Sequence, residues 1–372
     1  MTPAPRNSWE DLFAPPERPD QSVRLEMRLL RKGGRPFLLL PCQPRAAAAT
    51  LDLYPAQTPR ARAARSILRC LLRAALPLGT QSIFLSLSPA DPFVKFLSSF
   101  AGDPAPAAPP LGILAGNPMT DGQRFLLLVF DAAKKPVAVV KAGLTQRARA
   151  LIAQEAAFLT AVPPNTTAVP RLRAQFESPR LRALALDFFP GDPPRPQHEP
   201  ALPALLASWV DPNRPLLLSD APDWLRLEKA APAGALFSSL AGQLRARTLH
   251  PAIHHGDFAP WNIKVSPAGA WTVLDWERGE LAGIPGWDWF HYVIQTGILV
   301  GRLPAPALIQ RVEALLASGT FRQYADRGGI VGCERELLLA YLLHVVEVIK
   351  PSEGLAATAD LLKALSARWV NS

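Results

Sequence analysis

The chain has 372 residues, of which 49% are hydrophobic and 19% charged, a composition typical of globular proteins long enough for two or three compact units. Its 40 prolines follow no period, which excludes a collagen-like repeat. Of the net charge of +9, residues 1–110 hold 14 Lys and Arg against 8 Asp and Glu, so the rest of the chain contributes only +3 and a basic character throughout is excluded.

The N-terminal third predicts a small region without a catalytic motif. Residues 1–22 are polar and proline-rich and predict a flexible tail. From Val23 apolar and charged residues alternate, which indicates a strand, and a second apolar run follows at 36–41. Together with an arginine-rich helix at about 58–76, these segments predict an accessory α+β region over residues 23–100.

The arginines of this helix recur at three- and four-residue spacing, which places them on one face. The simplest interpretation is a solvated helix face. The alternative is a docking surface for another enzyme of the same pathway or for an anionic partner. Nucleic acid is disfavoured because no interleaved aromatic residues and no known binding module accompany the charge. The arginines are Arg60, Arg62, Arg65, Arg69 and Arg73.

A proline- and alanine-rich stretch at 102–110 predicts a linker. The next segment, 110–190, reads as three short strands, a helix and two further strands, which predicts a half-domain built on an antiparallel sheet. Residues 191–372 are dominated by amphipathic helical patterns, with two short strands between them at 263–265 and 272–274. The predicted fold class is therefore α+β, with a sheet lobe followed by a helical lobe.

The strongest chemical signal lies within the predicted helical lobe, in the segment from His254 to Val265. Asn262 follows Asp257 by five residues, and Asp275 ends the next predicted strand. Two carboxylates and an amide oxygen form the set that phosphoryl transfer needs. One carboxylate deprotonates the attacking hydroxyl, while the other carboxylate and the amide oxygen hold Mg²⁺ on the phosphates.

The pattern H-G-D-x-x-x-x-N, followed by an apolar strand and D-W-E, resembles the aminoglycoside phosphotransferase and choline kinase group, which are relatives of the protein kinases. The resemblance covers about residues 110–372. It implies a protein-kinase-like two-lobed fold that uses ATP, or alternatively GTP, together with Mg²⁺. By the same resemblance Asp257 is the catalytic base, His255 braces the catalytic loop, Asn262 and Asp275 are the Mg²⁺ ligands, and Asp288 supports the loop from beneath.

The resemblance also places a nucleotide clamp in the sheet lobe. Lys141 ends an apolar strand, where this fold has its phosphate-binding lysine, and Glu155 in the next helix would pair with it. Gly116 begins the predicted nucleotide loop, 116–122, which has two glycines and no G-x-G-x-x-G pattern.

The spacing after the metal-binding Asp favours a small-molecule acceptor over a protein. Only twelve residues separate Asp275 from Asp288, too few for a peptide-docking segment. We expect a hydroxyl of a sugar, an amino alcohol or a glycan precursor to be phosphorylated. A polycationic aminoglycoside is less favoured, since residues 277–372 hold 10 Asp and Glu against 9 Lys and Arg. The alternative is a catalytically silent kinase-like binding or scaffold protein of a glycan or envelope pathway.

The cysteines and the apolar runs predict a cytoplasmic protein. Cys42, Cys70 and Cys333 are scattered without C-x-x-C spacing, as expected for reduced thiols rather than a disulfide framework or a zinc site. The N-terminus lacks the apolar core of a signal peptide. No uncharged apolar run approaches the roughly 18 residues of a membrane span, so we expect no transmembrane segment.

Overall fold

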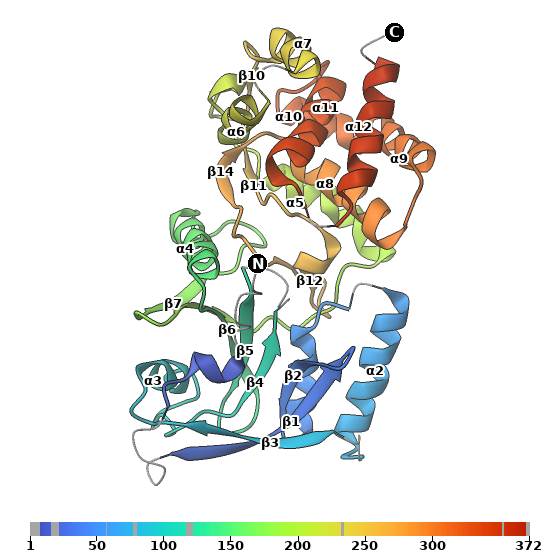
Figure 1. The fold of residues 1–372 in the computed structure, drawn as a ribbon. Helices are drawn as coiled ribbons and strands as arrows, with labels where there is room; N and C mark the ends of the chain where they lie inside the picture. The colour runs from blue at the N-terminus through green and yellow to red at the C-terminus, as the bar shows by residue number, and fades with distance from the viewer. Residues whose placement is uncertain are drawn as a thin grey trace, which may run out of the picture. The chain divides into compact units, whose positions relative to one another are not determined.

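The computed structural model describes residues 8–15, 22–56, 58–76, 80–116, 122–231, 234–351 and 353–369. These residues form two compact units (Figure 1). The first unit comprises the described residues of 1–160 together with 170–190. The second comprises 161–169 and the described residues from 191 onward.

An antiparallel sheet forms the centre of the first unit, and its strand order is β3-β1-β2-β4-β5-β6-β8-β7. The pairing of β2 with β4, through Leu38–Leu114 and Leu39–Ile113, joins strands from both sides of the predicted linker. The predicted accessory region and the predicted sheet lobe therefore share one sheet. The strands are β1 Val23–Lys32, β2 Arg35–Pro41, β3 Gln81–Leu87, β4 Leu111–Ala115, β5 Arg124–Phe130, β6 Pro136–Gly143, β7 Leu172–Glu177 and β8 Arg182–Asp187.

Both faces of this sheet are buried, and the strand pattern explains why. Successive side chains of a strand point to opposite faces, so Leu127 and Val129 of β5 enter one core while Leu128 and Phe130 enter the other. The first core is closed by α3 and the 3-10 turn Trp9–Leu12, and the second by α1 and α2 (Figure 1). These helices are α1 Pro44–Thr50, α2 Pro59–Arg73 and α3 Pro92–Ser98, and α4, Gln146–Ala161, follows β6.

Part of the predicted tail is packed against the sheet. Residues 8–15 contain the turn Trp9–Leu12, which Ser8 caps, and Leu12 is fully buried. The apolar side chains of this short segment fill the core beside α3, which the polar character of the whole stretch does not reveal. The remainder of the predicted tail before Ser22, residues 1–7 and 16–21, lies outside the described residues.

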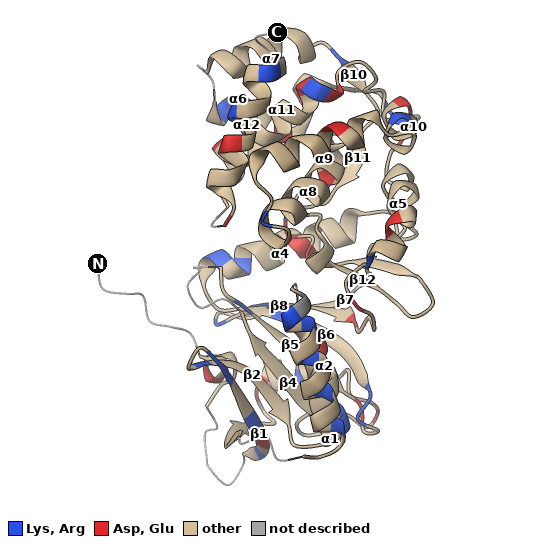
Figure 2. Cartoon of the chain, turned by 90° about the vertical axis from the view of Figure 1, so that its right-hand side faces the viewer, with Lys and Arg blue, Asp and Glu red and all other residues tan. Residues whose placement is uncertain are grey.

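The arginine stripe lies on α2, as Figure 2 shows by the blue segments of that helix. Two of its five members are turned toward the protein. Arg65 is buried and donates to the backbone oxygen of Tyr54 at 3.1 Å, and Arg69 pairs with Asp52. The solvated face of α2 therefore holds fewer arginines than their sequence spacing predicted. The reason is that the long side chains of Arg65 and Arg69 bond to a backbone oxygen and to an acidic group of the preceding turn.

The second unit is mainly helical, with short two-stranded sheets that position its loops. The strand pairs are β9 Leu216–Leu217 with β10 Thr248–Leu249, β11 Ala252–His254 with β14 Glu280–Gly283, and β12 Ile263–Val265 with β13 Trp271–Val273. The helices are α5 Leu202–Ser208, α6 Pro222–Ala230, α7 Ala235–Leu244, α8 Trp287–Gln295, α9 Ala305–Ala317, α10 Gly319–Arg327, α11 Glu334–His344 and α12 Leu355–Trp369.

An antiparallel-sheet unit beside a mainly helical unit confirms the predicted α+β fold class. None of the helices in the described part of the chain has the length and apolar character that a membrane span requires.

Candidate active site

The loop that follows β11 turns sharply at Gly256. This residue has φ of +76°, and a Cβ atom there would lie 2.8 Å from the Cβ of Arg278, so the backbone admits only glycine. The turn separates its two neighbours. His255 is fully buried, whereas the side chain of Asp257 is 34% exposed. The glycine of the H-G-D motif therefore allows one side chain to brace the loop and the other to face solvent.

Both carboxylate oxygens of Asp257 accept hydrogen bonds. Nε2 of His291 lies 3.1 Å from Oδ1, and Nδ2 of Asn262 donates to Oδ2 at 2.9 Å and to the backbone oxygen of Asp257 at 2.8 Å. Burial alone raises the pKa of Asp257, but the contact with His291 and the charge of Arg278 outweigh burial and bring the pKa below its ordinary value. The group is an ionised, anchored carboxylate that a hydroxyl can still reach.

The two predicted metal ligands lie at the same end of the β12–β13 hairpin. Ile263 pairs with Val273, and the backbone N–H of Leu274 donates to the backbone oxygen of Asn262 at 2.7 Å. Asp275 is the residue after Leu274, so its backbone lies close to that of Asn262. The NH₂ group of Asn262 donates to Asp257, which leaves the Oδ1 atom of the same amide as the candidate metal ligand. An amide oxygen and a carboxylate are hard donors, and this pair fits Mg²⁺.

The backbone of Asp275 adopts a conformation that side-chain-bearing residues rarely take. Its φ is +73°, in the left-handed region. Such residues cost free energy and concentrate at functional sites, where the surrounding structure holds them. Asp275 therefore departs from the relaxed backbone at the position where the sequence predicts a metal ligand.

His255 connects the Asp257 loop to the strand end that carries Asp275. Its Nε2–H donates to the backbone oxygen of Leu274 at 2.9 Å, and its Nδ1 accepts from the backbone N–H of Asp257 at 3.2 Å. Burial lowers the pKa of His255 and outweighs the nearby carboxylates. The neutral ring matches this pattern of one donor and one acceptor.

Asp288, in the first turn of α8, binds the same loop from the backbone side. Its Oδ2 accepts from the N–H of His255 at 2.7 Å, and its Oδ1 accepts from the N–H of Gly256 at 3.1 Å. The structure thus brings together all five residues that the sequence predicted for this loop and its support. Their roles in catalysis stay predictions.

Sequence reasoning missed two partners of the loop. His291 follows Asp288 by three residues, so helical spacing places both on one face of α8 and could have identified it. Tyr341, whose hydroxyl lies 3.0 Å from Nδ1 of His291, is 50 residues farther along the chain and gave no such signal.

His254, which immediately precedes the H-G-D motif, lies between two carboxylates. Its Nδ1 is 2.7 Å from Oδ2 of Asp223, and its Nε2 is 3.3 Å from Oδ1 of Asp288. Burial alone lowers the pKa of His254, but Asp288 and Asp223 together raise it to about 9. Both ring nitrogens then donate, so His254 is a buried imidazolium that links α6 to the support of the loop.

In the first unit, Lys141 of β6 and Glu155 of α4 form a two-pronged ion pair. The Nζ of Lys141 lies 2.7 Å from Oε1 and 2.8 Å from Oε2 of Glu155. The two side chains are 9% and 0% exposed. Burying two charges costs desolvation energy that the pair only partly recovers, so a pair of this kind is weak as a stabilising device. The predicted partners are in contact, and the aim of Lys141 at a phosphate stays a prediction.

Gly116 has a structural reason of its own. Its N–H donates to the backbone oxygen of Arg124 at 3.0 Å, and a Cβ atom at this position would lie 2.2 Å from that oxygen. The close approach of β4 and β5 therefore requires glycine here. Residues 117–121 of the predicted nucleotide loop lie outside the described residues, and nucleotide binding by Gly116 stays a prediction.

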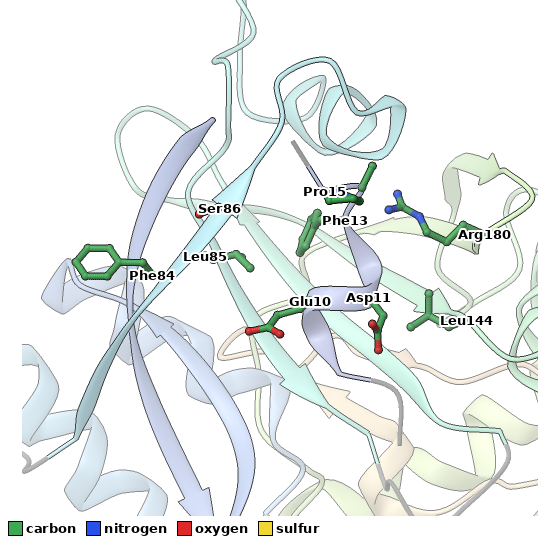
Figure 3. Close-up of a pocket in the computed structure, with 10 residues that line it drawn as sticks. Glu10, Asp11, Phe13, Pro15, Phe84, Leu85, Ser86, Leu144 and Arg180 are labelled. Carbon is green, nitrogen blue, oxygen red and sulfur yellow. The ribbon is translucent and has the colours of Figure 1, made fainter. Parts of the chain in front are cut away.

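The first unit also has an open cavity of about 710 Å³ (Figure 3). Neither Lys141 nor Glu155 lines it. Arg180, at its edge, binds Asp91, which also accepts from the backbone N–H groups of Ala14 and Phe93. The charged groups at this edge thus hold residues 8–15 and the start of α3 in place. The lining residues are Glu10, Asp11, Phe13, Ala14, Pro15, Phe84, Leu85, Ser86, Leu144 and Arg180.

Comparison with solved structures finds similar chains among small-molecule phosphotransferases. A protein of Haemophilus somnus assigned as a fructosamine-3-kinase is 14% identical, with 73% of this chain and 96% of that chain covered and a TM-score of 0.44. A thermostable mutant of aminoglycoside phosphotransferase APH(4)-Ia, solved with ADP and hygromycin B, is 12% identical, with 70% and 95% covered and a TM-score of 0.45. Aminoglycoside phosphotransferase APH(3'')-Id from Streptomyces rimosus is 14% identical, with 59% of this chain and 88% of that chain covered and a TM-score of 0.39.

Aminoglycoside phosphotransferases, the group that the H-G-D-x-x-x-x-N pattern resembles, are thus among the solved structures to which this chain is similar. No protein-family model and no curated protein matches the chain.

Proposed function

We propose that this protein is an ATP- and Mg²⁺-dependent phosphotransferase that acts on a hydroxyl of a small molecule. The observation that carries the proposal is the Asp257 carboxylate, which is anchored at both oxygens and still 34% exposed. A general base needs this combination, because it must be held in place and must also reach the proton that it takes.

The second unit supports the chemistry of phosphoryl transfer. Asp257 would accept the proton of the attacking hydroxyl, and Asn262 and Asp275 would hold Mg²⁺, which neutralises charge on the phosphates when bound. His255 and Asp288 keep the loop in shape through bonds to its backbone. Each of these bonds lies within the second unit.

For the first unit we propose nucleotide binding through Lys141. Glu155 holds the Lys141 ammonium at both carboxylate oxygens, which fixes the direction of the lysine side chain. ATP is the proposed donor, and GTP is the alternative.

The proposed acceptor is a sugar, an amino alcohol or a glycan precursor rather than a peptide. The short stretch from Asp275 to Asp288 contains β14, which pairs with β11 through Gly283–Ala252 and Glu280–His254. This pairing commits the stretch to the fold and supports the absence of a peptide-docking segment inferred from its length.

Purified protein tests the proposal through Mg²⁺-dependent ATP hydrolysis and phosphate transfer to a panel of sugars, amino alcohols and aminoglycosides. Asp257→Asn should lower turnover roughly 10²- to 10⁴-fold, the usual contribution of a general base. Asp326→Asn, an exposed carboxylate of α10, is the matched control and should change little. Equal turnover in wild type and Asp257→Asn would refute the proposal that this protein is an enzyme with Asp257 as its base.

A thermal-shift screen with Mg·ATP and Mg·GTP separates the enzyme from a silent scaffold protein. Binding to the folded state raises its melting temperature. Stabilisation by nucleotide without turnover would favour the scaffold, and no stabilisation by either nucleotide would count against both. A cytoplasmic location, and docking of a pathway enzyme or an anionic surface to the exposed arginines of α2, stay predictions.

A further inference from the structure

A chain of two hydrogen bonds runs from the Asp257 carboxylate into the core of the second unit. His291 of α8 forms the first bond, 3.1 Å from Oδ1, and Tyr341 of α11 forms the second, 3.0 Å from Nδ1 of His291. Both side chains are buried, with relative exposures of 7% for His291 and 2% for Tyr341. The chain of hydrogen bonds ends at the partly exposed Asp257 carboxylate. Helices α8 and α11 therefore contact this carboxylate through the buried side chains of His291 and Tyr341.

The chemistry of the three groups fixes where the protons are. A carboxylate only accepts hydrogen bonds, so Nε2 of His291 carries a hydrogen and donates it to Asp257. Burial raises the pKa of Tyr341 far above its ordinary value, so its hydroxyl keeps its proton and has a hydrogen to offer to Nδ1 of His291. With a hydrogen on Nε2, the Nδ1 atom of His291 is the acceptor that faces the Tyr341 hydroxyl, and this contact would select the Nε2–H tautomer.

From this geometry we propose that His291, oriented by Tyr341, is the positioning residue of the base Asp257. The inference rests on the proposed function. His291 holds Oδ1 while Asn262 holds Oδ2, so the plane of the carboxylate is set from two sides. Each oxygen keeps a second lone pair for the acceptor.

The ring positions the base and does not relay its proton. In the transfer step the acceptor's O–H bond breaks and its proton goes to Asp257. The acceptor oxygen bonds to the terminal phosphorus of ATP, and the bond from that phosphorus to the bridging oxygen breaks and releases ADP. Because Nε2 of His291 already carries a hydrogen, the ring cannot take the new proton from Oδ1, and the proton leaves Asp257 by its exposed side.

Substitutions at the two positions separate positioning from mere packing. His291→Leu fills the space without a donor and should lower the kcat of Mg²⁺-dependent ATP hydrolysis about 10²-fold, with the KM for ATP within about twofold of wild type. His291→Gln offers an amide N–H near the same place and should recover most of the lost turnover. Tyr341→Phe removes only the distal donor and should lower kcat roughly 2- to 10-fold. His198→Leu, in a turn of the same unit, is the control for loss of a histidine.

Nitrogen NMR of the full-length protein gives a second readout that needs no activity. Among the 6 histidines of the chain, the ring signals lost in His291→Gln identify His291. They should show a protonated Nε2 and an unprotonated Nδ1, and Tyr341→Phe should move the Nδ1 signal.

Each outcome decides a separate question. A wild-type protein without Mg²⁺-dependent turnover refutes the proposed function, while the NMR signature still tests the contact. If wild type is active, unchanged kcat in His291→Leu, or an Nδ1–H tautomer, overturns the inference. If His291→Leu does not fold, the other two variants decide. The inference is supported if His291→Gln is as active as wild type and Tyr341→Phe is slower. It is overturned if the kcat of Tyr341→Phe is unchanged.

Discussion

The two units bury charge in different ways. In the first, Lys141 gives two bonds to one carboxylate, that of Glu155. In the second, Asp223 contacts His254, Arg226 and His344, and His254 also contacts Asp288. Removing Glu155 deprives the buried Lys141 ammonium of both of these bonds, whereas Asp223 keeps two of its three contacts when one of them is removed. The difference predicts that the first unit is sensitive to single substitutions and the second is buffered.

The largest effect on stability is expected when one partner of the Lys141–Glu155 ion pair is removed. Glu155→Leu should lower the stability of the first unit by about 3–5 kcal/mol, because the Lys141 ammonium is left buried without its carboxylate. Hydrogen exchange of β6 and β8 measures this locally. The double variant Lys141→Met/Glu155→Leu should recover most of the loss and should still fail to bind nucleotide. A double variant as unstable as the single one would contradict the charge argument.

Removing the centre of the network should cost less. His254→Gln keeps one side-chain donor and should lower the stability of the second unit by about 1–3 kcal/mol, the usual cost of a buried polar group that loses a partner. Tryptophan fluorescence during denaturation follows this unit, because of the 9 tryptophans only Trp9 belongs to the first. A loss as large as that of Glu155→Leu would remove the distinction between pair and network.

The network also predicts a pH dependence. The pKa of His254 is about 9 in the folded protein against 6.5 ordinarily, so its contribution is complete below pH 6.5 and is lost as pH rises through about 9. The slope is on the order of 1 kcal/mol per pH unit over that window. Burial lowers the pKa of His344 to about 4, so the pH dependence that it causes runs the other way. The stability that the neutral His344 ring contributes is present above pH 6.5 and is lost as pH falls through about 4.

Denaturation midpoints across pH measure both limbs. His254→Gln should flatten the alkaline limb and leave the acidic limb in place. An alkaline limb that persists in this variant would show that another group causes it.

The smallest effect is expected at the edge of the network. Arg226 binds Asp223 and Glu280, but its side chain is 44% exposed, and Asp223 keeps His254 after its removal. Arg226→Gln should therefore lower stability by about 1 kcal/mol or less. The same denaturation experiment measures it, and a loss above that of His254→Gln would show that Arg226, rather than His254, carries the network.

The loop around Asp257 was predictable because its members are close in sequence. Gly256 and Asp257 lie on one turn, and Asn262 and Asp275 flank one short hairpin. The Lys141–Glu155 contact was predicted from the resemblance to the aminoglycoside phosphotransferase and choline kinase group, and the structure shows the two side chains in contact. The network of Asp223 and His254 was not, because 31 residues separate the two side chains and no local period relates them.

The sequence by itself determined the α+β class, and it predicted Asp257, Asn262 and Asp275 as a candidate set for phosphoryl transfer. Only the tertiary structure decided that strands on both sides of the 102–110 linker share one sheet, and that His291 and Tyr341 form a hydrogen-bonded chain to the Asp257 carboxylate. The reason is the range of the interactions. Strand periodicity and hairpin register act between neighbours in the chain, whereas β2–β4 pairing and the packing of α8 on α11 depend on how distant segments fill the same core.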